Sequence, residues 1–277
     1  MLNKFVLMED LNRYNKEGSD LRKLQYRMLE LLEVLDKICK KHNLPYWLEG
    51  GTLLGAVRHG GFIPWDDDLD VQMLRSDYKK LLKILPKELP GNIALQTFKT
   101  DKGYYRYVAK LRDLNSKLIS TSVDYKDCKF QGVFIDIIPM EFIKSKFLNK
   151  VSIYIRWKIV ALKVKIPNDK LGLKILLFNI IYFFENLMHF SFRLVDLFIR
   201  KNRELSYSYG IDFYEYSCPI EYIFPLSSIT FENKVFWAPH DVDGMLRRNY
   251  GNNYMEIPPE DQREIQAHSL GVIFNEK

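Results

Sequence analysis

Hydrophobic residues recur at helical spacing near the start of the chain. Over 21–38 the apolar side chains follow one another at intervals of three and four, with charged residues between them, which is typical of an amphipathic helix that packs on a core. The run 46–48 is short and apolar, ends at Gly50-Gly51, and is followed by helical composition over 52–58. We therefore expect a helix, a strand, a glycine turn and a short helix in that order.

Strand patterns dominate the middle of the chain. Polar and apolar residues alternate over 68–73, which predicts a half-buried strand, and a helix is expected to follow over 76–85. The stretch 104–119 predicts two strands joined by a turn. The run 132–139 is β-branched and aromatic and is closed by proline, so it indicates a core strand that carries one carboxylate, Asp136.

The last part of the chain returns to short mixed elements. A strand is expected over 231–237, and a helix over 242–250 that stops at Gly251. The whole chain has 277 residues, of which 47% are hydrophobic and 27% charged. It is therefore long enough to bury one substantial core and a smaller second one, and it is not a disordered tail.

The segment 142–205 differs from the rest in charge. It holds 9 lysines and 4 arginines against 4 acids, a net charge of +9, whereas the chain as a whole carries +6 and the remainder therefore −3. The segment is also strongly apolar, notably over 175–184, but its unbroken apolar run is far shorter than the roughly 20 residues that span a bilayer. We expect a basic, apolar helical insertion that does not cross a membrane.

Cysteine use and the amino terminus bear on location. The three cysteines, Cys39, Cys128 and Cys218, are odd in number and widely spaced, so they suit neither a disulfide framework nor a metal site, and a reducing compartment is expected. The first ten residues lack an apolar run, so no secretion signal is expected. Both features favour a cytoplasmic location.

Four aspartates crowd into five positions, at 66, 67, 68 and 70. Such crowding is costly unless cations or ordered donors compensate it. On a strand, Asp68 and Asp70 would point to one face about 7 Å apart, a spacing that lets two carboxylates share hard divalent ions. Asp136 would add a third carboxylate if its strand is a neighbour. Three converging carboxylates indicate metal-assisted phosphoryl transfer.

Alternatives exist for this acidic run. A calcium-binding loop that starts at Asp66 would need glycine and glutamate where the chain has Val71 and Asp77, so that interpretation fails. A solvated acidic turn remains an interpretation for Asp66 and Asp67. Asp136 is harder to explain in that way, because burying a carboxylate inside an apolar strand without a partner is expensive.

The glycine turn suits an anionic substrate. Gly50, Gly51 and Thr52 would present backbone N–H groups and a helix N-terminus, and Thr52 could cap the helix or bind a phosphate oxygen. The turn is not a Walker loop, because no lysine follows it. Arg58 and His59 could reach a diphosphate from the far end of the helix, or could simply be cations placed at a helix C-terminus.

Lys110 and Arg112 are further candidates for phosphate contacts, since their spacing puts both on one face of a strand. An ordinary solvated basic strand face is the alternative.

The run from Leu48 to Val71, Leu-Glu-Gly-Gly-Thr-Leu-Leu-Gly-Ala-Val-Arg-His-Gly-Gly-Phe-Ile-Pro-Trp-Asp-Asp-Asp-Leu-Asp-Val, resembles the signature of the LicD family. The resemblance continues at 75–78 and 134–139, and again at 250–259 with His268. It covers most of the chain outside 142–205.

This resemblance implies a nucleotidyltransferase-like α+β fold, with a small mixed sheet flanked by helices. It implies a catalytic core over 1–141, the helical insertion over 142–205, and a carboxy-terminal part over 206–277 that completes the catalytic domain. The glycine turn would be Gly50, Gly51 and Thr52. The catalytic and metal-binding acids would be Asp68, Asp70 and Asp136.

The family is associated with the transfer of phosphocholine from CDP-choline to a sugar hydroxyl of a cell-surface glycan, such as a teichoic acid, a lipooligosaccharide or a capsule, with CMP leaving. Relatives move other phospho-alcohols or phosphonates, so phosphoethanolamine, ribitol phosphate and aminoethylphosphonate are alternatives. The implied cofactor is Mg²⁺, or Mn²⁺ in its place. Asp136 would complete the metal site or accept the proton of the acceptor hydroxyl, and the glycine turn and Arg58 would hold charge on the CMP side.

If choline is the group that moves, its quaternary ammonium should lie against aromatic faces. Trp65, next to the acids, is the first candidate, and Tyr104, Tyr105, Tyr107 and Trp237 are further candidates that also suit core packing.

For 142–205, one hypothesis is a helical insertion on the inner face of the cytoplasmic membrane, where a lipid-linked acceptor would be found. The alternative is a helical subdomain or dimer interface with snorkelling lysines.

Two rival functions belong to other classes. Nucleotide addition to RNA suits the fold and the basic segment, but the chain has no RNA-binding motif, so no nucleic-acid partner is expected. A non-catalytic glycan- or lipid-binding protein would not need the three aspartates and the glycine turn.

Overall fold

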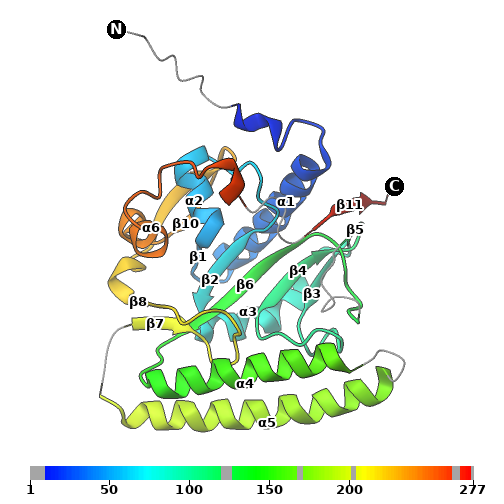
Figure 1. The fold of residues 1–277 in the computed structure, drawn as a ribbon, viewed down its shortest axis with the longest axis vertical. Coiled ribbons are helices and arrows are strands. Elements are labelled where there is room, and N and C mark those ends of the chain that lie inside the picture. Colours follow the sequence, from blue (N-terminus) through cyan, green and yellow to red (C-terminus); the bar gives the residue numbers. More distant parts are fainter. Residues whose placement is uncertain (1–9, 120–126, 167–170, 201–203, 264–268, 276–277) are drawn as a thin grey trace.

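The computed structural model of the protein describes residues 10–119, 127–166, 171–200, 204–263 and 269–275. The strands of its main sheet are β1 (Tyr46–Leu48), β2 (Asp70–Leu74), β3 (Ile93–Gln96), β4 (Ala109–Asp113), β6 (Phe134–Glu141), β7 (Glu204–Tyr207) and β8 (Ser217–Pro219). Their order is β1-β2-β6-β4-β3, and β7 joins β6 to β8 (Figure 1). The mixed sheet flanked by helices confirms the expected α+β fold.

Parallel and antiparallel pairing meet at β6. β2 runs parallel to β6 with Asp70 opposite Asp136, whereas β4 runs antiparallel to β6 with Lys110 opposite Asp136. Residues directly opposite each other on neighbouring strands lie on the same face of the sheet. The register therefore places Asp70, Asp136 and Lys110 in one row across three strands.

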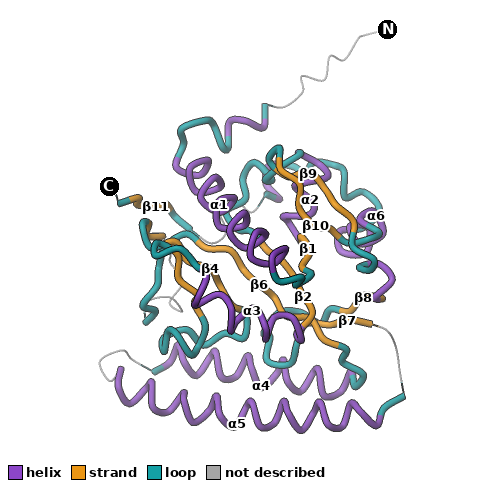
Figure 2. The backbone as a smooth tube through the Cα atoms, turned by 180° about the vertical axis from the view of Figure 1, so that it is seen from behind, coloured by secondary structure: helices purple, strands orange, loops and turns teal. Residues whose placement is uncertain are grey.

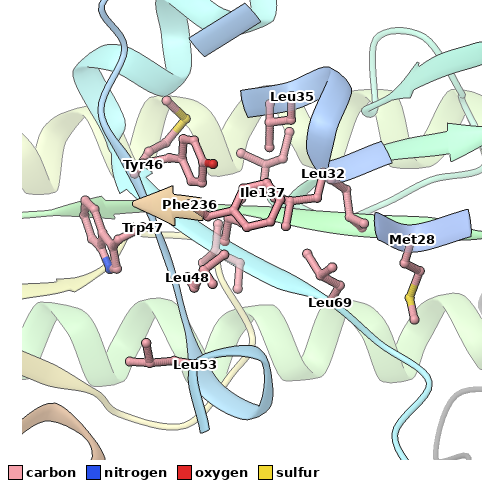
Figure 3. Close-up of a cluster of buried hydrophobic side chains, with 14 of the residues drawn as sticks. Met28, Leu32, Leu35, Tyr46, Trp47, Leu48, Leu53, Leu69, Ile137 and Phe236 are labelled. Carbon is pink, nitrogen blue, oxygen red and sulfur yellow. The ribbon is translucent and has the colours of Figure 1, made fainter. Parts of the chain in front are cut away.

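Helices α1 (Asp20–Lys41) and α3 (Arg75–Glu88) pack on the sheet and on each other. The Ser19 hydroxyl caps α1 by accepting a hydrogen bond from the N–H of Arg22, and the apolar stripe that starts there is buried along the whole helix. Figure 3 shows Met28, Leu32 and Leu35 of this stripe among the side chains of the sheet. The expected first helix and its inward face are confirmed.

Helix α2 (Gly50–His59) connects β1 to β2, and α6 (Val242–Tyr250) packs against it. The single strand expected over 231–237 was wrong, because the structure forms a hairpin of β9 (Ser227–Phe231) and β10 (Lys234–Ala238). Glu232 and Asn233 turn the chain with φ angles of 50° and 61°. Two consecutive positive φ values are typical of a tight hairpin turn.

The two strands expected within 104–119 exist but do not pair with each other. β4 belongs to the main sheet, whereas β5 (Ser116–Ile119) pairs with β11 (Gly271–Phe274) from the other end of the sequence. The residues before β4, at 104–107, form turns and bends rather than a strand. Three short 3₁₀ turns, at Leu11–Arg13, Ile220–Tyr222 and Glu260–Gln262, complete the described elements.

The basic apolar segment forms two long helices, α4 (Lys146–Lys165) and α5 (Leu171–Phe198), which confirms its helical character. They lie side by side along one end of the sheet, and α5 is the outer of the two (Figures 1 and 2). Among the described residues, the helix at Gly172–Phe198 is long and apolar enough to cross a membrane by length and composition. The unbroken apolar run is short, as expected, but the helix around it continues through its charged residues to that length.

Candidate active site

The row of charged side chains on β2, β6 and β4 is the centre of the site. The Lys110 ammonium lies 2.7 Å from the Asp136 carboxylate and 3.5 Å from the centre of the Phe134 ring. Lys110 is only 3% exposed. The alternative of a solvated basic strand face was wrong, since this lysine is buried and paired with the one carboxylate embedded in the core strand.

The acids at 66, 68 and 70 converge on the same place. β2 begins at Asp70 rather than Asp68, so Asp68 lies in the loop that leads into the strand. The pKa of Asp70 is raised well above its usual value, first by burial and then by the negative charges of Asp68 and Asp136, while Lys110 opposes the shift. Burial, repulsion by Asp68 and a side-chain hydrogen bond to Asp68 likewise raise the pKa of Asp66. Four carboxylates therefore share one electrostatic environment.

Asp67 has a structural role. It is 2% exposed, and the Ser269 hydroxyl donates a hydrogen bond of 2.7 Å to its carboxylate. The side chain of Gln25 on α1 donates to the backbone carbonyl of Asp66 at 3.0 Å. The interpretation of Asp66 and Asp67 as a solvated acidic turn was wrong, because the loop is held from both sides, Asp67 is buried and Asp66 is only partly exposed.

The glycine turn is the first turn of α2 itself, which begins at Gly50. A Cβ added to Gly51 would lie 2.8 Å from the Asp66 carboxylate, so the helix N-terminus directly adjoins the acidic cluster. The Thr52 hydroxyl accepts a hydrogen bond of 2.9 Å from the backbone N–H of Asp70 and is therefore not the helix cap that was one of its expected roles. It fixes α2 to the start of β2.

Glu49 was not among the predicted site residues. It precedes α2, is 3% exposed, and its carboxylate accepts a 3.4 Å hydrogen bond from the Asn249 amide. Burial raises the pKa of Glu49 to about 8, against the opposing hydrogen bonds from Gly50 and Asn249. The signal in the sequence was a glutamate directly between an apolar strand and the glycine turn.

A group of tyrosines lies on the carboxy-terminal side of the site. The hydroxyl of Tyr250 would be 3.8 Å from a Cβ at Gly50, and its pKa is raised by burial and by the charges of Glu49, Asp66 and Asp68, among others. Tyr214 also contributes to that shift, and its ring lies edge-on to Tyr207 at 6.0 Å between centroids.

A cavity of about 570 Å³ adjoins these tyrosines. Its walls include side chains from α4, from β7 and from the segment that leads into β8, together with two residues of α6. The residues that matter here are Lys146, Glu204, Tyr214, Tyr216, Arg248 and Asn249. Because Asn249 also contacts Glu49, the cavity lies next to the residue that precedes α2, and it can hold a small polar group.

Arg58 and Arg112 are engaged elsewhere. The Arg58 guanidinium donates to the backbone carbonyls of Tyr254 and Glu256, and its Nε contacts the His59 ring. Arg112 is buried and donates to Gln96 and to the carbonyl of Gly132. Their predicted phosphate contacts stay predictions, and these hydrogen bonds favour a structural role for both.

The aromatic residues proposed for a choline group are packed in the protein. Trp65 is 6% exposed, and the Arg263 guanidinium lies 4.8 Å from its ring centre. The remaining candidates pack against other aromatic rings or donate to backbone groups; they are Tyr104, Tyr105, Tyr107 and Trp237. The tyrosines of the cavity, which the sequence analysis did not single out, are better placed.

The described part of the chain contains no group of three or more histidine, cysteine, aspartate or glutamate side chains arranged to hold a metal ion. The chemistry of the donor set nevertheless suits a hard divalent cation, because neighbouring carboxylates raise the pKa of Asp66 and of Asp70, and Lys110 opposes the shift at Asp70. His268, part of the family motif, lies outside the described residues.

The mixed sheet, the glycine turn at the start of α2 and the acids on β2 and β6 define a nucleotidyltransferase-like domain. Residues 43–169 match the family model described as LicD/FKTN/FKRP, nucleotidyltransferase domain. This stretch, a little under half of the chain, is similar to the nucleotidyltransferase domain of the LicD family.

Similar proteins extend this assignment. The lipopolysaccharide cholinephosphotransferase LicD of Haemophilus influenzae is 27% identical over 265 residues, which cover 88% of this chain and 94% of that protein. Human ribitol 5-phosphate transferase FKRP is 62% identical over 32 residues, or 12% of this chain and 6% of its own. Mouse ribitol-5-phosphate transferase FKTN is 42% identical over 53 residues, 19% of this chain and 12% of its own. The protein is therefore an enzyme of the LicD type, a phospho-alcohol transferase.

Proposed function

We propose that the protein transfers phosphocholine from CDP-choline to a hydroxyl group of a cell-surface glycan and releases CMP. The oxygen of the acceptor bonds to the phosphorus of the choline phosphate, the bond from that phosphorus to the CMP oxygen breaks, and the acceptor proton is taken up by a base or by water. The observation that carries this proposal is the row of Asp70, Asp136 and Lys110 beside the N-terminus of α2.

Each part of the row has a role in this reaction. The backbone N–H groups at the start of α2 and the Lys110 ammonium bind phosphate oxygens. Mg²⁺ or Mn²⁺ held by Asp68, Asp70 and Asp136 would neutralise the charge of the donor diphosphate. Asp136 accepts the proton of the acceptor hydroxyl once Lys110, now 2.7 Å from it, turns to the phosphate.

The tyrosines and the adjoining cavity support choline as the alcohol. A quaternary ammonium binds to aromatic faces, and Tyr214 and Tyr216 line the cavity together with the acidic Glu204. The relative that matches 88% of the chain is named a cholinephosphotransferase. Ribitol phosphate is the second candidate, because two kinds of relative that match shorter stretches are named for it. A cytoplasmic location is part of the proposal.

The test measures CMP release with Mg²⁺, a glycan acceptor and one donor at a time: CDP-choline, CDP-ethanolamine, CDP-ribitol or CDP-glycerol. We expect Asp136→Asn to lower kcat by at least about 100-fold, as loss of a group that stabilises the transition state does. Asp20→Asn, a matched change at an exposed aspartate at the start of α1, should retain full activity. Full activity of Asp136→Asn would overturn the assigned site.

Donor choice has its own variant. Replacing Tyr214 by alanine should raise KM for CDP-choline by roughly 2-fold to 30-fold, the range of one cation–π contact, and should leave KM for CDP-ribitol unchanged. Faster turnover of CDP-ribitol by the unaltered enzyme would replace choline with ribitol in the proposal. If activity survives complete removal of divalent cations by EDTA, the proposed metal requirement is refuted.

A further inference from the structure

Helix α5 buries a polar face and exposes an apolar one, the reverse of a surface helix in a water-soluble protein. Its inward stripe recurs at positions 174, 178, 185, 189 and 196, and four of these five residues are polar or charged. Lys174 forms an ion pair with Asp127 at 2.8 Å, and Glu185 forms one with Arg156 of α4 at 3.0 Å. The polar face of this helix is therefore turned into the protein.

The other two polar residues of the stripe are also held inside. His189 lies 3.1 Å from the Ser152 hydroxyl of α4, and the Tyr209 hydroxyl donates to Asp196 at 2.8 Å. Polar contacts thus anchor α5 to the body of the protein from its first turns to its last.

The outward face of α5 is apolar along the whole helix. Leu176, Phe183, Leu187, Phe190 and Leu197 are each more than half exposed, with exposed fractions from 53% to 71%. An apolar face of this length on a water-exposed helix marks an interaction site.

The exposed polar side chains on α5 are turned back onto the helix. The Asn186 amide donates to the carbonyl of Tyr182 at 2.6 Å, and the Ser191 hydroxyl donates to the carbonyl of Leu187 at 3.1 Å. In an apolar environment a polar side chain has no water to bind, so it must form its hydrogen bonds within the protein, as these two do. None of the described exposed side chains of α5 carries a charge.

The exposed charges that α4 and α5 themselves carry have one sign, although Lys150 lies 3.6 Å from the exposed Glu215 of a neighbouring segment. Within the described residues of 142–200, the exposed charged side chains are all basic: Lys146, Lys150, Lys158 and Lys165 on α4, and Arg200 after α5. The acids described there, Glu185 and Asp196, are buried and paired. A second copy of the chain would bring like charges together, whereas an anionic lipid surface complements them.

We propose that the helix pair α4–α5 docks the enzyme on an anionic lipid bilayer, with the outward face of α5 in the interfacial region. The helix lies along the membrane and does not cross it, because a crossing would pull its paired inward side chains away from their partners. Figure 1 shows α5 as the outermost layer, with α4 between it and the sheet, so the face is free to meet a flat surface.

Vesicle flotation of the full chain tests this proposal. We expect at least ten times more protein to float with vesicles of phosphatidylcholine and phosphatidylglycerol than with phosphatidylcholine alone. A carbonate wash at high pH should release it, as it releases proteins that do not span the bilayer. The triple variant Leu176→Gln, Phe183→Gln, Phe190→Gln should lose at least tenfold in binding to the anionic vesicles.

Three further variants, one triple and two single, separate the contributions. Val235→Gln, Leu270→Gln and Ile273→Gln alter three exposed apolar residues elsewhere and should float like the unaltered protein. Lys158→Gln and Lys165→Gln should weaken anionic binding by about fivefold each. Circular dichroism checks that every variant is folded, and CMP release from a soluble acceptor shows whether the active site survives independently of docking.

Three results would overturn the proposal. The first is unchanged flotation of the α5 triple variant. The second is absence of flotation with both lipid mixtures. If light scattering then shows a dimer that the triple variant dissociates, the face binds a second copy of the chain instead. The third is resistance to the carbonate wash, which would make α5 a membrane span.

Discussion

The ion pair between Arg156 and Glu185 gives the sharpest test of the buried polar face of α5. Both side chains are almost completely buried, at 0% and 4% exposure, and the two charged groups are 3.0 Å apart. The pair is incompletely satisfied, because Nε and Nη2 of Arg156 and Oε1 of Glu185 have no hydrogen-bond partner among the described residues. Replacing one partner by an apolar residue leaves the other charge buried without a counter-charge. Replacing both removes the pair together with these three unsatisfied atoms.

The expected magnitudes follow from this difference. Arg156→Met should lower the free energy of unfolding by about 3–5 kcal/mol, because it leaves the Glu185 carboxylate buried without a counter-charge. Glu185→Leu should cost about as much, since it leaves a buried guanidinium. The double variant should be close to the unaltered protein or more stable, so the coupling energy is at least about 3 kcal/mol. Protonation limits the cost of Arg156→Met, because burial already raises the pKa of Glu185.

Urea unfolding followed by circular dichroism measures the three values, with the slope m used to confirm that the same transition is compared. The matched control is the pair Arg247 and Asp243, which lies on the surface of α6 at about half exposure and should show a coupling below about 1 kcal/mol. Additive effects of Arg156→Met and Glu185→Leu would refute the burial of this helix face.

Two more predictions follow from buried contacts. Burial, followed by the charges of Arg193, Arg156 and Arg75, lowers the pKa of His189 to about 3, whereas the unfolded chain titrates near 6.5. As the pH falls below about 6.5, His189 is protonated in the unfolded state but stays neutral in the folded state. Between pH 7 and pH 5 the free energy of unfolding should therefore fall by about 2 kcal/mol more in the unaltered protein than in His189→Gln. Equal pH dependence of the two proteins in urea unfolding would contradict this. Gly51→Ala would place a Cβ 2.8 Å from the Asp66 carboxylate and should lower kcat for CMP release by at least about tenfold, whereas Gly91→Ala, where nothing lies within 4 Å, should have no effect. Normal activity of Gly51→Ala would separate the helix N-terminus from the acidic site.

Elements with a strong local pattern were predicted closely. The helix expected over 242–250 has those bounds, because its apolar spacing, its first turn and the terminating Gly251 are all local features. The strand expected over 231–237 failed for the opposite reason. The hairpin turn at Glu232 and Asn233 contains neither glycine nor proline, the two residues that most strongly signal a turn in a sequence.

The site was partly predictable. Asp68 and Asp70 stood out by their spacing within a crowded acidic run, and Asp136 because a carboxylate is rare inside an apolar strand. The register of β2 and β6 does bring Asp70 opposite Asp136. Nothing local distinguished Lys110 from Arg112, since both are basic residues on one strand. Only the order of the strands pairs Lys110 with Asp136 and directs Arg112 to Gln96 and Gly132.

The sequence by itself determined the kind of chemistry and the location of most elements, because residue type, spacing and family resemblance are local properties of a chain. It also determined that 142–205 is basic and apolar. The tertiary structure decided which face of each helix meets water. The polar stripe of α5 is buried because Arg156, Ser152 and Tyr209 come from other segments to pair with it, and its apolar face is therefore left outside. Such a choice depends on the partners that folding supplies, which no single segment encodes.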